Sequence, residues 1–336
     1  MASLKASGIT ARVFADTVPD PTTASINAGV EFCKEGDHDC VIGFGGGSPL
    51  DSAKAIAVMS QFGGVMRDYM VPHVQDAPGL PVIAIPTTAG TGSEATRFTI
   101  ITDEVTNEKM LCVGLAYLPI AALIDFELTL TMPRRLTADT GIDSLVHAME
   151  AYVSKKANLF SDAMALQAMK ALAPNLRVVD REPDNRQARE AMMIGATQAG
   201  IAFSNASVAL VHGMSRPIGA YFHVPHGLSN AMLLPVVTAY SAPAALQRYA
   251  QCAVAMGVAK GGEGDQASVA RLLDELRALN TDLQVPSPEA YGISREKWES
   301  VKHTMAEQAL ASGSPGNNPR VPTVDEIKEL YDQAYS

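Results

Sequence analysis

Residues 40–58, CVIGFGGGSPLDSAKAIAV, decide the fold of the first part of the chain. A strand is predicted over Cys40–Phe44, and it runs through three glycines into a helix that is expected to begin at Ser48. Ser48 can cap this helix, Pro49 suits its first position, and Asp51 completes a Ser-x-x-Asp capping box. Such a turn leaves backbone N–H groups able to bind phosphate, although an ordinary tight turn uses the same residue types.

A second polar, glycine-rich loop lies in PVIAIPTTAGTGSEAT, residues 81–96, directly after another predicted strand. Its hydroxyl groups belong to Thr87, Thr88, Thr91 and Ser93. Because both loops follow strands of one mainly parallel sheet, we expect them to face the crevice where doubly wound sheets bind nucleotides. The presence of both loops therefore favours a nucleotide-binding site over the alternative that they are two ordinary turns with no shared role.

The sequence changes character near residue 130. Before it, strands are predicted over Ala11–Ala15, Cys40–Phe44, Leu80–Ile85 and Ala121–Asp125, with helical stretches between them. After it, apolar residues at helical spacing predict helices over residues 143–153, 161–173 and 269–279. We therefore predict an α/β, Rossmann-like domain with a mainly parallel sheet over residues 1–130, and an all-α domain over residues 131–336.

The composition excludes several classes of partner. The 336 residues are 47% hydrophobic, carry a formal charge of −10 and include four cysteines without C-x-x-C spacing. The negative charge disfavours nucleic acids and acidic lipid surfaces, and no apolar run approaches the roughly 20 residues that span a bilayer. A cytoplasmic protein with neither nucleic acid nor membrane as partner is expected.

Acidic and histidine residues stand at spacings that suit a metal ion. In GIDSLVHAMEAY, Asp143 and His147 are four residues apart on a predicted helix, so their side chains leave the same face. The later stretch LVHGMSRPIGAYFHVPHGLSNAM contains His212, His223 and His226, and its two prolines are expected to break the helix. A lone histidine of this kind is usually a hydrogen-bonded core residue, but a carboxylate with several imidazoles suits Fe(II) or Zn(II).

Taken together, these motifs resemble the iron-containing (group III) alcohol dehydrogenases over essentially the whole chain. The resemblance rests on GGGSPLDSAKAIA, PTTAGTGSE, TGIDSLVHAMEAY, FSNASVALVHGM, VPHG and GSPGNNPRVPT, in this order. It implies a dehydroquinate synthase-like fold with the metal in the cleft between the two domains. It also implies a reversible hydride transfer between NAD or NADP and a small alcohol or aldehyde, in a homo-oligomer that is a dimer or larger.

The resemblance implies a role for particular residues. The metal, Fe(II) with Zn(II) as the alternative, would be held by Asp143, His147, His212 and His226. Cofactor contacts fall on Gly46, Gly47, Ser48, Thr87, Thr88, Thr91, Lys109 and Leu128. Asp51 would lie towards the nicotinamide and substrate, and Phe203 would help to wall the pocket.

Arg216 departs from the family pattern. Many relatives have a proton-relaying histidine four residues after the ligand that corresponds to His212, whereas arginine cannot act as a base. We therefore expect His223 to take over the relay. Arg216 could instead hold a carboxylate on the substrate, which would make the protein a dehydrogenase of hydroxy-acids or semialdehydes.

The start of the sequence is the second departure. The family begins with a further strand-turn-helix unit, and this sequence opens at what resembles the tail of its helix, SLKASG. Without that unit the sheet would have an unpaired apolar edge, and the residue that separates NAD from NADP would be absent. A smaller departure is Asp20, where the family usually has asparagine.

Three other interpretations stay open from the sequence. A truncated metal-binding protein without redox activity would follow from the lost unit. A dehydroquinate synthase would favour a glutamate ligand and a basic phosphate pocket, whereas here the ligand position is Asp143. A glycerol dehydrogenase fits less well with the three-histidine pattern and the GGGSP loop.

Overall fold

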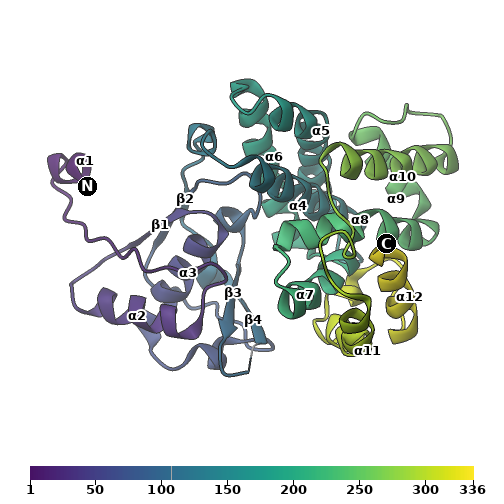
Figure 1. The fold of residues 1–336 in the computed structure, drawn as a ribbon. Helices are drawn as coiled ribbons and strands as arrows, with labels where there is room; N and C mark the ends of the chain where they lie inside the picture. The colour runs from purple at the N-terminus through teal and green to yellow at the C-terminus, as the bar shows by residue number, and fades with distance from the viewer. Residues whose placement is uncertain (107) are drawn as a thin grey trace. The chain divides into compact units, whose positions relative to one another are not determined.

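The computed structural model describes residues 1–106 and 108–336, and it divides into two compact units (Figure 1). The first unit comprises Met1–Ile85 and Arg97–Ala122, and the second comprises Pro86–Thr96 and Leu123–Ser336. An α/β part is thus followed by a mainly helical one, which confirms the predicted fold class.

The first unit is built around a small sheet and a hairpin. Its helices are α1 (Ala2–Ala6), α2 (Thr23–Lys34) and α3 (Gly47–Phe62), with 3₁₀ turns η1 (Met66–Tyr69) and η3 (Leu115–Tyr117). Its strands are β1 (Val41–Gly45), β2 (Val82–Pro86), β3 (Phe98–Asp103), β4 (Glu108–Val113) and β5 (Ala121–Ala122). The sheet order is β1-β2-β5, with β2 parallel to β5, and β3 pairs antiparallel with β4.

One strand prediction for this unit was wrong, a second was too long, and one hairpin was missed. Residues 11–15 form no strand, because their side chains pack on α2: the Phe14 and Phe32 rings lie 5.6 Å apart, and Arg12 covers Phe32 at 4.1 Å. The strand predicted over Ala121–Asp125 ends at Ala122, since the chain enters the other unit there. The strands of the β3–β4 hairpin alternate half-buried and buried residues, and this two-residue period differs from the continuous apolar runs from which strands were predicted.

The start of α3 also differs from the prediction. Helix α3 begins at Gly47 with Gly46 as its N-cap, and no described side chain caps it. Ser48 is therefore inside the first turn, where its hydroxyl accepts a hydrogen bond from the Asp20 backbone N–H at 3.2 Å. The Asp51 carboxylate accepts from the Ile100 N–H at 3.0 Å, so it closes no capping box.

The second unit is a helical bundle. Its helices are α4 (Arg134–Val153), α5 (Leu159–Arg181), α6 (Arg186–Ala206), α7 (Leu210–Phe222), α8 (His226–Ser241), α9 (Leu246–Ala255), α10 (Asp265–Asp282), α11 (Arg295–Ala311) and α12 (Val324–Tyr335). The 3₁₀ turns are η2 (Ser93–Ala95), η4 (Phe126–Thr129), η5 (Ala242–Ala244) and η6 (Ser314–Asn317). Every residue from Gly141 to Val153 is buried, which makes α4 the central helix of this unit.

The break between α7 and α8 is placed by one proline rather than two. Pro217 lies inside α7, contrary to the expectation that it would end a helix, whereas Pro225 is the N-cap of α8. Helix α7 ends at Phe222, and its C-cap His223 has a left-handed conformation with φ of 55°. Of the helices described, none alone is long and apolar enough to cross a membrane; α6 and α7 would be so only as a pair, and they are bent by 104°.

The segment 86–96 belongs to the helical unit although it precedes that unit in the sequence. The Ser144 hydroxyl donates to the Gly90 carbonyl at 2.9 Å, and the Thr197 hydroxyl donates to Glu94 at 2.7 Å. Gly92 has a φ of 63°, and a Cβ added to it would lie 2.5 Å from the Gly200 Cα. Glycine at this position therefore allows the loop to approach α6 closely.

Candidate metal centre

One face of the buried helix α4 carries three ionisable side chains. Asp143, His147 and Glu150 follow one another at helical spacings of four and three residues. All three are at most 5% exposed, and the helix that carries them contributes many side chains to the main apolar core of this unit. Burying such groups is costly unless they have partners, so their contacts define what this region can do.

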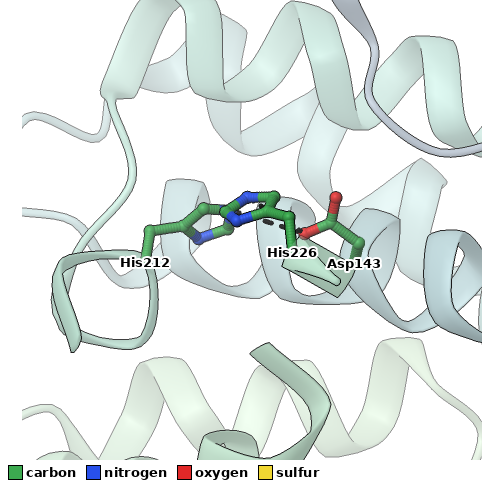
Figure 2. Close-up of side chains that lie close together, drawn as sticks. All are labelled: Asp143, His212 and His226. Carbon is green, nitrogen blue, oxygen red and sulfur yellow. Dashed lines mark ion pairs between the residues drawn. The ribbon is translucent and has the colours of Figure 1, made fainter. Parts of the chain in front are cut away.

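Three imidazoles converge on one oxygen of Asp143, and Figure 2 shows two of them, those of His212 and His226. The Oδ1 atom of Asp143 lies 3.5 Å from His212 Nε2 and 3.9 Å from both His147 Nε2 and His226 Nε2. Ligand atoms of Asp143, His212 and His226 all lie within 4.8 Å of one another, which is the compactness that a metal site requires. These residues come from α4, α7 and α8.

The cluster is enclosed on most sides and open at one residue. Asp143, His147 and His212 are buried, whereas the His226 side chain is 43% exposed at the first residue of α8. A small molecule could therefore reach the cluster past His226. The imidazole of His147 stacks on that of His212 at 4.5 Å, and the ring of Phe203 stacks on His147 at 4.3 Å.

An asparagine that the sequence analysis missed stands among the ligand atoms. The Asn230 Nδ2 atom lies 2.6 Å from Asp143 Oδ1 and 3.3 Å from both His212 Nε2 and His226 Nε2. Its Oδ1 atom is buried and finds no hydrogen-bond partner among the described residues. One amide nitrogen is thus surrounded by a carboxylate oxygen and two imidazole nitrogens. These are the atoms that bind a divalent cation of this kind, so the residues fit a metal ion.

The pKa values follow from this crowding. Burial by itself raises the pKa of Asp143, but the surrounding imidazoles outweigh burial and hold this pKa well below its usual range. Burial lowers the pKa of His147 to about 4, which favours a neutral ring. For His212, burial is outweighed by hydrogen bonds with Asp143 and Glu150, which raise the pKa to about 9.

Glu150 is a second residue of this region that the sequence analysis missed. Its carboxylate lies 2.7 Å from His212 Nδ1, on the opposite side of the ring from Asp143. It also accepts hydrogen bonds from the backbone N–H groups of Ala209 at 2.9 Å and Val211 at 2.6 Å. The signal in the sequence was an acidic residue seven positions after Asp143, which is the same helix face.

Two of the predicted catalytic residues lie in α7 or directly after it. Arg216 is in α7, where its guanidinium donates to the Ser314 hydroxyl at 3.2 Å, and burial lowers its pKa. Among the described residues, no carboxylate lies within ion-pair distance of Arg216, although the nearby charge of Glu150 partly opposes the lowering of this pKa. His223 is exposed at the end of α7.

The residues predicted to contact the cofactor fall in both units. In the first, Gly46, Gly47 and Ser48 form the half-exposed start of α3, and Lys109 Nζ lies 2.9 Å from Asp20 Oδ1. In the second, Thr87, Thr88 and Thr91 are half-buried in the segment 86–96, and Leu128 lies in η4. The Thr91 hydroxyl accepts from the Ser93 N–H at 3.3 Å.

Comparison with known proteins identifies the family. The model of the iron-containing alcohol dehydrogenases matches residues 1–126, and that of the C-terminal part of the Fe-containing alcohol dehydrogenase family matches residues 137–335. The NADPH-dependent butanol dehydrogenase of Clostridium saccharobutylicum is 34% identical over 99% of this chain and 86% of its own length. The NAD-dependent methanol dehydrogenase of Bacillus methanolicus is 35% identical over the same shares.

A solved structure supports the same conclusion. The alcohol dehydrogenase from Oenococcus oeni superposes with a TM-score of 0.94 at 34% identity, over 99% of this chain and 86% of that one. The chain therefore belongs to the iron-containing alcohol dehydrogenase family and is an oxidoreductase that acts on alcohols.

Proposed function

We propose that Asp143, His147, His212 and His226 hold a divalent metal ion in this alcohol dehydrogenase. The observation that carries the proposal is the convergence of three imidazoles on a single buried carboxylate oxygen. Imidazole and carboxylate ligands suit Fe(II), which the family name also favours, and Zn(II) is the alternative.

The reaction is a reversible hydride transfer between a small alcohol or aldehyde and NAD or NADP. When bound, the metal ion would stabilise negative charge on the alcohol oxygen and polarise an aldehyde carbonyl. The nicotinamide would accept or supply the hydride. Relatives named as NADPH-dependent and as NAD-dependent match this chain equally well, so both cofactors are retained.

The residues around the ligands shape the reaction. The ring of Phe203 covers His147 and keeps water from that side of the cluster. The exposed side of His226 admits the substrate, and His223, three residues earlier, exchanges the proton with solvent. Arg216 cannot accept a proton, so it takes no part in this relay.

The nucleotide is assigned to the glycine turn. The N–H groups of Gly47 and Ser48 lie in the uncapped first turn of α3, where a pyrophosphate is stabilised by the helix end. Thr87, Thr88, Thr91, Lys109 and Leu128 supply further contacts, and Asp51 lies towards the nicotinamide. We assign nucleotide binding to residues 1–130 and metal binding to residues 131–336, in a cytoplasmic homo-oligomer that is a dimer or larger.

The proposal is tested with protein purified under anaerobic conditions. Metal content is measured, and a panel of short alcohols and aldehydes is assayed with NAD(H) and NADP(H) before and after exhaustive chelation. We expect chelation to abolish turnover and Fe(II) or Zn(II) to restore it, while NAD(P)H still binds by fluorescence titration. Normal turnover by metal-free protein would overturn the proposal.

A second candidate substrate class rests on Arg216. Its guanidinium has a neutral partner, the Ser314 hydroxyl, and no ion-paired carboxylate among the described residues, so it could hold a carboxylate on a hydroxy-acid or semialdehyde. The test compares carboxylated with plain alcohols for wild type and Arg216→Ala. A preference for carboxylated substrates that disappears in the variant supports this class, and an unchanged preference removes it.

A further inference from the structure

We propose that Glu150 is a positioning residue of the metal centre, which acts through His212. The proposal rests on the proposed function, because it takes His212 as a metal ligand. Its content is that the Glu150 carboxylate fixes the proton of His212 on Nδ1 and holds the ring so that Nε2 points to the ligand site.

The contacts of Glu150 are short, charged and buried. The carboxylate is 2.7 Å from His212 Nδ1, and it accepts from the N–H groups of Ala209 and Val211 at 2.9 and 2.6 Å. Glu150 is 4% exposed. A buried carboxylate with three donors is held in one position, so it can in turn hold the ring that it contacts.

The chemistry of imidazole explains why this contact matters for a metal. A neutral imidazole has one N–H and one lone pair, and the hydrogen bond made by one nitrogen decides which form is present. A carboxylate only accepts, so Glu150 selects the N–H on Nδ1 of His212. A divalent metal ion would then take the place of the proton on Nε2, which lies 3.5 Å from Asp143 Oδ1. A ligand fixed in this way binds a metal more tightly than one that must be oriented on binding.

A purely structural role for Glu150 is the alternative, and the fold provides a control for it. The turn between α6 and α7 is also held by the Ser154 hydroxyl, which donates to the Ala206 carbonyl at 2.6 Å. Ser154 is the C-cap of α4, four residues after Glu150, and it holds the same connection between α6 and α7. Because no contact joins Ser154 to His212, Ser154→Ala loosens the turn without touching the ligand.

The experiment measures the affinity of metal-free protein for Co²⁺, by competition with a chelator and by the visible absorption of the bound ion. Glu150→Gln replaces one acceptor oxygen by an amide NH2 group, which only donates, and we expect it to weaken Co²⁺ binding about 10- to 100-fold and to alter the absorption band. Ser154→Ala is expected to stay within about threefold of wild type. Glu150→Asp, which keeps the charge, serves as a second variant if the glutamine variant does not fold by circular dichroism.

A double-mutant cycle decides whether Glu150 acts through His212. In the His212→Ala background, Glu150→Gln should change the Co²⁺ affinity by less than about threefold. The proposal is overturned if Glu150→Gln binds Co²⁺ as tightly as wild type, or if its loss is equally large without His212. If His212→Ala itself leaves Co²⁺ binding intact, the ligand set of the proposed function fails, and the role of Glu150 fails with it.

Discussion

The two candidate sites of this chain are built in opposite ways. The metal cluster consists of side chains on long buried helices, each held by several contacts, with Asp143 at its centre. The glycine turn at the start of α3 is half-exposed, and what it offers a ligand is backbone. A site made of side chains should fail outright when one is removed, whereas a site made of backbone should weaken by degrees.

Removing the central carboxylate should have the largest effect. Asp143→Ala takes away the oxygen that all three imidazoles face, so we expect alcohol oxidation to fall about a thousandfold or more and the metal content to approach zero. NAD(P)H binding, followed by fluorescence, should stay near the wild-type value. A variant that keeps both its metal and its activity would contradict the assignment of the cluster.

A methyl group in the glycine turn should have a smaller, graded effect. Gly47 is the first residue of α3 and does not have a positive φ, so Gly47→Ala keeps the backbone unstrained while crowding a bound phosphate. We expect the KM for NAD(P) to rise about tenfold, as for the loss of one hydrogen bond to a charged group, at unchanged metal content. An unchanged KM would mean that the pyrophosphate binds elsewhere.

The aromatic wall of the metal cluster should matter less than its ligands. Phe203→Ala removes the ring that stacks on His147, and such a pair contributes about 1 kcal/mol, so metal affinity should fall about fivefold. Phe203→Leu keeps much of the apolar volume and controls for packing. If both variants bind Co²⁺ as tightly as wild type, the ring of Phe203 does not help to hold His147 as a metal ligand.

The smallest effect concerns the surface of the nucleotide site. Lys109 pairs with the exposed Asp20 at 2.9 Å, and Asp20→Asn would release Lys109 for a phosphate. Exposed ion pairs are worth at most about 1 kcal/mol, so the KM for NAD(P) should fall by only about two- to threefold. Steady-state kinetics at low ionic strength measure this, and a KM that rises instead would remove Lys109 from the cofactor site.

The sequence predicted the helices and strands better than it predicted which of them contact one another. The α/β and helical parts followed from hydrophobic periodicity, and so did the shared face of Asp143 and His147 on α4. Periodicity within one helix cannot say that α7 and α8 approach that face, so His212 and His226 entered the ligand set through family resemblance. Glu150 could have been found by continuing the same face of α4 by one more turn.

The errors have physical causes. Residues 11–15 have strand-like composition, but a strand forms only where a neighbouring strand completes its hydrogen bonds, and here Phe14 packs on α2 instead. Ser48 was expected to cap α3 because serine is a common cap, yet Gly46 takes that position. Asn230 gave no signal, since a single asparagine in an apolar helix acquires meaning only from the side chains that the fold brings to it.

The placement of residues 86–96 has a consequence for how the chain is made. This loop leaves the ribosome before α4 and α6, the helices that supply its partners Ser144, Thr197 and Gly200. Its contacts with these helices can therefore form only after more than half of the protein has been synthesised. A fragment that begins after residue 122 would not fold as an independent helical unit, because it would lack the segment 86–96, which packs against Gly200.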